Sequence, residues 1–240
     1  MMLRVIFLIF AISLAGVCNG QDIGLDLRVG YSTYSMRHLR DFQHKQYAHP
    51  LPLKVVNDFP ANISAGFNLF FWFREDIETG IEYSNHKTLG RVHYSDYSGE
   101  IGIDQTAKAH VLGIFTRCRV LQRNNFALKV SGSLTAWMSS VEFVQYYRIG
   151  NDLELTELSV VSTNVGVALS IEPVYKISEH FYVGLKLGGM IDVPRPLHLK
   201  KEKDVILEDS NGNEVYAHWA GLRSEFYLSM PLGNRRSSNK

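Results

Sequence analysis

The chain has 240 residues, of which 45% are hydrophobic and 20% are charged, and its formal net charge is +1. This near-neutral charge argues against a protein that binds nucleic acid through bulk positive charge. The hydrophobic content is enough to build a core, which excludes an acidic disordered protein. After the first 20 residues no apolar run approaches the ~20 residues of a transmembrane helix, so an α-helical membrane protein is not expected.

The first 20 residues are predicted to be a secretory signal peptide. Arg4 supplies the positive charge, an apolar run extends from Val5 to Val17, and small residues lead to a cleavage site after Gly20. Removal of this segment takes away one arginine and leaves equal numbers of basic and acidic residues. The chain is therefore expected to be exported.

The two cysteines, Cys18 and Cys118, bear on whether the exported protein carries a lipid anchor or a disulfide. A lipid anchor at Cys18 is the less favoured alternative, because Val17 and Ala15 do not match the small residue and the leucine of a lipobox. Cleavage leaves Cys118 alone, so no internal disulfide is expected. An exported domain of this kind depends on its core and its backbone hydrogen bonds.

Apolar residues alternate with small or polar residues along most of the chain after Gln21. This period of two predicts β-strands, because successive side chains of a strand point to opposite faces. Eight strands are predicted, over residues 23–32, 62–73, 77–83, 101–118, 126–134, 164–172, 181–188 and 220–228. In the fourth segment the pattern does not indicate which face is apolar.

The predicted connections alternate between short and long. The short ones cover residues 74–76, 122–125 and 178–180, and the long ones cover residues 37–60, 89–100, 140–157 and 193–214. An up-and-down membrane barrel has tight turns at one end and long loops at the other. The pattern therefore predicts an all-β fold, an eight-stranded antiparallel up-and-down transmembrane β-barrel.

Alternation alone leaves open whether the apolar faces point inward, as in a soluble lipocalin-like barrel, or outward into lipid. The polar faces carry mostly small residues and few charges, which suits the narrow interior of eight strands. Large aromatic residues stand near the strand ends, where an interfacial girdle is expected: Tyr31, Phe73, Tyr83, Phe126 and Phe181. The outward arrangement is therefore favoured, and closure would pair every backbone amide in lipid.

Charged residues on the predicted inner faces are the candidate site. The six chosen positions are Arg28, Glu82, Glu172, Lys186, Arg223 and Glu225. Eight strands leave an interior that side chains fill, so we expect a structural network of Arg–Glu and Lys–Glu contacts across the lumen rather than a pore lining.

With this pattern in view, the chain resembles the small, eight-stranded outer-membrane β-barrel proteins of bacteria, particularly poorly characterised ones from Bacteroidetes-like bacteria. The stretch Gly90–Glu100 resembles the second outer loop of such proteins, and the likeness covers Gln21–Leu232. One departure is the end of the chain, since such barrels usually end in an aromatic residue that the assembly machinery recognises. Here either Phe226 or Tyr227 takes that role, or the insertion signal is atypical.

The resemblance implies a location in the bacterial outer membrane and a non-enzymatic role, structural or as a presenter of surface loops. Its implied domains are a signal peptide (1–20), a barrel (21–233) and a disordered tail (234–240). The implied partners are outer-membrane lipid, the barrel-assembly machinery during insertion and an unknown ligand of the outer loops, with no nucleic acid. No catalytic residue, metal or other cofactor is expected.

Two alternatives remain open at this stage. A soluble exported barrel would bind a small apolar ligand among large apolar residues in its lumen. A lipid-modifying outer-membrane enzyme would need a histidine and a serine at the lipid-facing rim, for which His110 is the candidate histidine.

The remaining histidines and the loop tyrosines carry weaker signals. His38, His44, His49 and His198 show no metal-binding spacing, so solvated loop histidines are expected. Tyrosines in the predicted outer loops suit contact with a ligand or packing over the barrel mouth. They are Tyr34, Tyr47, Tyr94, Tyr97, Tyr146 and Tyr147.

Overall fold

The structure, a computed structural model, describes residues 23–46, 54–97, 99–150, 152–202 and 204–232. The signal peptide and the tail predicted at the two ends lie outside these residues. The strands are β1 (Ile23–Ser32), β2 (Lys54–Asp58), β3 (Asn62–Arg74), β4 (Ile77–Ser95), β5 (Glu100–Arg123), β6 (Phe126–Ile149), β7 (Asp152–Lys176), β8 (Tyr182–Val193), β9 (His198–Leu199) and β10 (Gly221–Pro231), and the helix is α2 (Arg37–Gln46). Among the described residues, no helix has the length and apolar character needed to cross a membrane.

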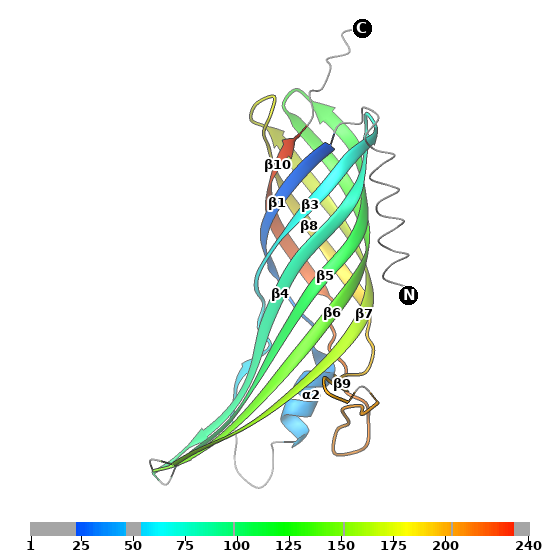
Figure 1. Ribbon diagram of the computed structural model, residues 1–240. Coiled ribbons are helices and arrows are strands. Elements are labelled where there is room, and N and C mark those ends of the chain that lie inside the picture. The colour runs from blue at the N-terminus through cyan, green and yellow to red at the C-terminus, as the bar shows by residue number, and fades with distance from the viewer. Residues whose placement is uncertain (1–22, 47–53, 98, 151, 203, 233–240) are drawn as a thin grey trace.

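Eight of the strands form a closed antiparallel barrel (Figure 1). In ring order they are β1, β3, β4, β5, β6, β7, β8 and β10, and β10 pairs with β1 to close the ring. Each predicted strand corresponds to one of these eight. The structure therefore confirms the predicted eight-stranded up-and-down barrel.

The apolar faces of the strands point outward. Along β1, Leu27 and Val29 are 49% and 52% exposed, whereas Arg28 between them is 7% exposed. The same arrangement continues around the ring, where the exposed outward side chains include Leu112, Ile114, Leu134, Val167, Leu169 and Leu222. A closed barrel with an apolar outer belt satisfies its backbone internally and suits a lipid bilayer. The alternative of a soluble barrel whose strands turn their apolar faces inward is therefore wrong.

The predicted aromatic positions lie on the outer wall. Tyr31, Phe73, Phe126 and Phe181 are exposed there, and Tyr83 is partly buried. At the last strand the two candidate aromatics differ, because Phe226 points outward and Tyr227 is buried in the lumen. Phe226 is thus the one of the two that lies on the apolar outer wall.

Four neighbouring strands continue far beyond the barrel. Strands β4, β5, β6 and β7 have 19, 24, 24 and 25 residues, whereas β1, β3, β8 and β10 have 10, 13, 12 and 11. About 9–11 residues of a tilted strand span a bilayer. The extra length of roughly ten residues per strand corresponds to about 30 Å. We call residues 86–95, 100–109, 140–149 and 152–161 the protruding sheet; it extends to the lower left in Figure 1.

The protruding sheet corrects two predicted loops. Residues 89–100 and 140–157 are mostly strand, since β4 ends at Ser95, β5 begins at Glu100, β6 ends at Ile149 and β7 begins at Asp152. The stretch Gly90–Glu100 that resembles an outer loop is likewise the end of β4, a turn and the start of β5. The prediction failed because a sheet that stands in water is polar, as a loop is, so composition does not separate the two. Long and short connections therefore do not alternate strictly.

The other two long connections are confirmed, and they fold over one mouth of the barrel. Residues 33–61 contain α2 and β2, and residues 194–220 contain β9, which pairs with β7. Both lie at the end from which the protruding sheet extends (Figure 1). The turns at 75–76, 124–125 and 177–181 lie at the opposite end, together with the start of β1 and the end of β10.

Candidate functional site

One cluster of charges in the lumen centres on Arg117. Its guanidinium donates to Asp26 at 2.7 Å and to Glu172 at 3.1 Å, and its Nε lies 2.9 Å from a Glu78 oxygen. The Tyr227 hydroxyl donates to Glu172 at 3.0 Å. The Arg117 side chain is 1% exposed. Strands β1, β4, β5, β7 and β10 are thus tied together inside the barrel.

Further polar groups complete this cluster. Lys129 Nζ lies 2.5 Å from Glu78, and the Asn68 amide donates to Asp26 at 3.1 Å. The Ser131 hydroxyl donates to Glu172 at 2.5 Å. Each buried carboxylate therefore has a cation or a hydrogen-bond donor, as burial of charge requires.

A second cluster lies nearer to the protruding sheet. Arg28 contacts Glu225 at 2.9 Å and Glu82 at 3.3 Å, and Lys186 lies 3.5 Å from Glu82. The Arg223 guanidinium carbon stands 4.7 Å from the centre of the Trp137 ring, in a cation–π geometry.

The structure places all six predicted site residues in the lumen. Arg28, Glu82, Lys186 and Glu225 come together in one cluster with Arg223 beside them, whereas Glu172 belongs to the other cluster. Together the two clusters hold five cations and five carboxylates: Arg28, Arg117, Lys129, Lys186 and Arg223 against Asp26, Glu78, Glu82, Glu172 and Glu225. The network is therefore formally neutral.

Sequence reasoning missed Arg117, the centre of the first cluster. The inward neighbours of Arg117 on β5 include Val111 and Phe115, while Leu112 and Ile114 face outward, so both faces of this strand are apolar. One signal was available: Arg117 is four residues from Gly113, so the two share a face of the strand, and a small residue suits the narrow lumen. The sequence alone does not show which face is the inner one, because that follows from the pairing of β5 with β4 and β6.

An apolar cluster closes the mouth beneath the protruding sheet. Trp137 and Trp219 stack with ring centres 5.6 Å apart, and Tyr34 packs edge-on against Trp219 at 5.1 Å. The Trp219 indole donates to Ser139 at 2.8 Å. We call this cluster the apolar plug; its members are Tyr34, Met36, Leu39, Phe42, Phe59, Trp137, Val141, Phe143, Val160, Leu197, Val215, Ala217 and Trp219.

A carboxylate on β8 fastens the loop that carries Trp219. Asp192 accepts hydrogen bonds from the backbone amides of Trp219 at 3.1 Å and Ala220 at 3.0 Å, and from the Asn164 amide at 3.0 Å. The long connection 194–220 is therefore anchored into the barrel mouth. Nothing in the sequence around Asp192 indicates this role, since it depends on the return of a distant loop.

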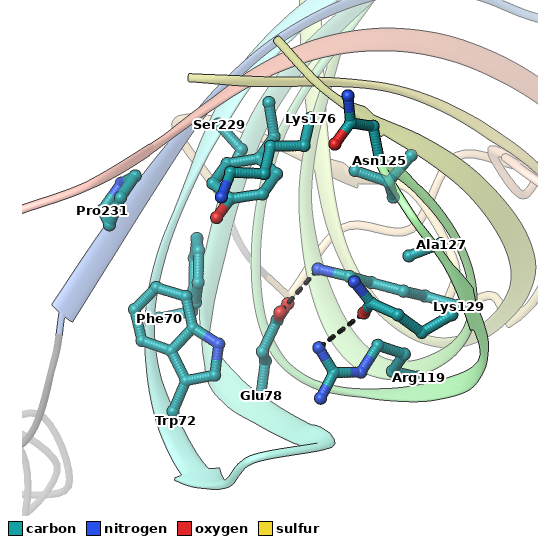
Figure 2. A pocket seen from close by; sticks show the side chains of 13 residues that line it. Phe70, Trp72, Glu78, Arg119, Asn125, Ala127, Lys129, Lys176, Ser229 and Pro231 are labelled. Atoms are coloured by element: carbon teal, nitrogen blue, oxygen red, sulfur yellow. Dashed lines mark hydrogen bonds and ion pairs between the residues drawn. The ribbon is translucent and has the colours of Figure 1, made fainter. Parts of the chain in front are cut away.

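The opposite mouth has a small recess of about 120 Å³ (Figure 2). Phe70 and Trp72 stand on one side of it, and Lys129 lies across from them and contacts Glu78. Because Glu78 also contacts Arg117, the recess ends on the first charge cluster. It is a depression in the barrel end, lined by residues of the barrel wall and of the short turns.

On the outer wall, His110 has partners other than the serine expected of a lipid-modifying enzyme. Its Nδ1 lies 2.8 Å from the Tyr83 hydroxyl and 3.3 Å from the Asn85 amide nitrogen. No serine hydrogen-bonds to His110 among the residues that the structure describes.

The loop histidines are scattered rather than gathered. His38 on α2 stacks on His218 with ring centres 5.3 Å apart, His44 is exposed on the same helix, and His198 lies in β9. His49 lies outside the described residues. Within the described part of the chain, no group of three histidine, cysteine or acidic side chains has a geometry that would hold a metal ion.

The six tyrosines predicted in loops occupy three environments. Tyr34 belongs to the apolar plug, and Tyr97 is fully exposed in the β4–β5 turn. Tyr94, Tyr146 and Tyr147 lie on strands of the protruding sheet, and Tyr47 lies outside the described residues. Three of the six tyrosines predicted in loops therefore lie on a sheet instead.

No protein-family model matches the chain, and no curated protein sequence matches it. Among solved structures it is similar to Neisserial surface protein A, with a TM-score of 0.41 and 11% identity over 88% of this chain and 97% of that one. It is also similar to Ail, the attachment invasion locus protein of Yersinia pestis, with a TM-score of 0.31 and 14% identity over 88% and 97% of the two chains. The outer-membrane protease OmpT of Escherichia coli gives a TM-score of 0.36 and 9% identity over 88% and 95%. These similarities concern the fold alone.

Proposed function

We propose that this chain is an integral outer-membrane β-barrel protein of a bacterium that holds the protruding sheet at the cell surface for contact with an extracellular partner. The observation that carries the proposal is the unbroken pairing of β6 with β7 from Phe126 and Tyr175 in the barrel wall to Ile149 and Asp152 at the far tip. A barrel wall continued in this way is a rigid support for a surface outside the membrane.

The lumen supports a role in display rather than transport. We propose that its paired charges hold the barrel rigid, because eight strands leave an interior that side chains fill. The apolar plug stands over the network at one mouth, and the recess at the other mouth ends on Glu78. The expected result in a planar lipid bilayer is the absence of steady current steps. A regular open-channel conductance would contradict this role.

One edge of the protruding sheet suggests how contact would be made. Residues Asp152–Leu158 pair with β6 on one side, whereas the described partners of β7 on its other side begin only at Ser159, whose carbonyl accepts from Lys200. A free strand edge of this kind offers backbone groups to an added strand.

The side chains along this edge indicate the chemistry of the partner. Leu153, Leu155 and Leu158 are exposed, and three exposed acidic residues, Asp152, Glu154 and Glu157, are interspersed among them. An extended segment with basic and apolar side chains would pair with the backbone and also neutralise these carboxylates. We therefore propose a basic, extended peptide segment as the class of partner.

Epitope insertion tests the orientation in the membrane. An epitope in the β6–β7 turn at Gly150 is expected to bind antibody on intact cells. The same epitope in the β5–β6 turn at Asn124 should bind only after the outer membrane is permeabilised, and both variants should show heat-modifiable gel mobility. Reversed labelling would contradict the orientation, and recovery from the soluble periplasm without a mobility shift would contradict membrane insertion.

Peptide binding tests the contact role. The probe is a fluorescent peptide of alternating lysine and leucine, added to the purified full chain. The variant D152N/E154Q/E157Q is expected to lose binding. A second variant replaces residues 144–157 with an Asn-Gly turn between Phe143 and Leu158, which are paired in the sheet, and it is also expected to lose binding. The matched control, E202Q/D204N/E208Q, removes three exposed acids from another loop and should bind as the parent does. Equal binding by all variants would contradict the proposal.

A further inference from the structure

A polar cluster interrupts the outer wall where β4 and β5 leave the apolar belt. The outward residues of β4, taken from the short-turn end, are Thr79, Ile81, Tyr83 and Asn85, and the next is Lys87. On β5, Lys108 likewise follows apolar outward residues and His110. Lys87 and Lys108 are the first outward charges beyond the belt on these two strands, at the level expected for lipid headgroups.

These two lysines stand side by side. They are directly opposite one another in the β4–β5 register, a position in which like charges destabilise a sheet. Lys108 contacts Glu142 on β6 at 3.0 Å, but Lys87 is exposed and has no acidic partner among the described residues. The pair therefore retains an uncompensated positive charge that a bound anion would neutralise.

His110 adds a hydrogen-bond donor one row nearer the membrane. The Asn85 amide nitrogen, which can only donate, lies 3.3 Å from His110 Nδ1, and the Tyr83 hydroxyl lies 2.8 Å from the same atom. Nδ1 is therefore the acceptor, and the ring hydrogen resides on Nε2 in the neutral imidazole. His110 is exposed, so Nε2–H is available to an oxygen of a ligand.

The surroundings identify the kind of anion. Leu112 and Ile114 lie below the cluster on β5, and Met138 lies opposite His110 on β6; the three are 49%, 62% and 49% exposed on the outer wall. Acyl chains can lie along these residues while the headgroup reaches the lysines. A free phosphate ion would gain nothing from this apolar surface.

We infer that Lys87, Lys108 and His110 form a binding site for the phosphate-bearing headgroup of an anionic lipid in the outer leaflet. The lysine ammoniums and His110 Nε2–H donate to the phosphate oxygens, and Tyr83 and Asn85 hold the imidazole ring in place. This inference rests on the proposed membrane insertion and adds a specific lipid contact to it.

Native mass spectrometry of the full chain in neutral detergent tests the site. The lipid probes are diphosphorylated lipid A and zwitterionic phosphatidylcholine, and inorganic phosphate is added in a separate arm. Each basic residue near an anionic surface contributes appreciably to binding, so K87Q/K108Q is expected to weaken the binding of lipid A by about tenfold or more. The control K200Q/K201Q removes two exposed lysines from the 194–220 loop and should bind as the parent does.

The other outcomes separate the possible errors. Equal binding of lipid A by the parent and by K87Q/K108Q would overturn the site. Binding of phosphatidylcholine by the parent as tightly as lipid A would overturn it as well. Displacement of lipid A by millimolar inorganic phosphate would show a free-anion site instead of a lipid site. Heat-modifiable mobility of every variant shows that the barrel has formed, so its loss in the parent would count against the proposed function and not against this site.

Discussion

Arg117 and Asp26 form an ion pair of 2.7 Å between β5 and β1, two strands that are not neighbours in the barrel. The pair crosses the lumen and is shielded from solvent, with both side chains 1% exposed. Contacts of this kind connect parts of the wall that the hydrogen-bond ladder does not join directly.

We expect Arg117→Leu to destabilise the barrel strongly. The substitution leaves Asp26, Glu78 and Glu172 buried without their shared cation, and removal of one partner from a buried ion pair costs about 3–5 kcal/mol. The measurement is urea unfolding in lipid vesicles, followed by gel mobility.

The control for this prediction is Arg119→Leu, two residues along the same strand. Arg119 pairs with Asp76, which is 66% exposed, and exposed pairs contribute roughly 0–1 kcal/mol. Equal destabilisation by both substitutions would show that the lumen network has no special part in stability.

We expect Trp219→Ala to open the plug and leave the barrel intact. Removal of a buried tryptophan costs about 3–5 kcal/mol, and here the loss falls on the docking of the 194–220 loop. Protease added to intact cells should then cleave after Lys200 or Lys201, while the heat-modifiable band of the barrel persists. The matched substitution Tyr97→Ala removes an aromatic that is fully exposed, and resistance to cleavage should be unchanged.

We expect uneven hydrogen exchange along β7. Residues 165–176 lie between β6 and β8, whereas Asp152–Leu158 have a described partner strand on one side only. Amides at an unpaired edge open more readily than amides inside a sheet. Hydrogen–deuterium exchange should therefore be faster over 152–158 than over 165–176. Equal protection in the isolated protein would show that this edge is already covered and is not free for a partner.

We expect the contact between α2 and the 194–220 loop to weaken in acid. Burial and the neighbouring charge of His218 lower the pKa of His38 below its ordinary value of about 6.5. The undocked form therefore binds a proton more readily than the docked form. The docked arrangement of α2 and the loop is therefore fully stabilised at pH values above the ordinary pKa of histidine. This stabilisation declines as the pH falls through that value toward the lowered pKa of His38.

Tryptophan fluorescence between pH 8 and pH 5 measures this loss, because Trp219 lies in the loop that contacts α2 through His218. The variant His38→Gln should flatten the pH dependence without lowering the signal at pH 8. An identical pH profile for the variant would assign the effect to other groups.

The wall of the barrel could be predicted from the sequence because alternation is a local property. Leu27, Arg28 and Val29 already indicate two faces, and the short polar stretches between strands indicate turns. The same reasoning failed above the membrane. Glu154 and Glu157 mark residues 140–157 as solvated, but solvation is common to loops and to a sheet in water, so strand length was underestimated.

The candidate sites could be predicted from the sequence to different degrees, because they depend differently on long-range contacts. The six lumen charges could be predicted because each lies on the polar face of its alternating strand. Their grouping into two clusters follows from barrel closure, which brings Glu82 and Glu225 to the guanidinium of Arg28. Arg117 was missed because both faces of its strand are apolar. The Lys87–Lys108 pair was invisible in the sequence because the two residues are distant along the chain and meet only through strand register.

Alternation, turn residues and composition are thus enough to predict eight amphipathic strands and a barrel fold, since each depends on neighbours a few residues apart. Ring closure, register and the return of the 194–220 loop specify the rest: which charges pair, where the mouth is closed and how far the wall continues beyond the membrane. These features depend on contacts between residues far apart in the chain, such as Arg28 and Glu225, which are separated by 197 positions. Their energies arise from burial and ion pairing, which no local pattern encodes.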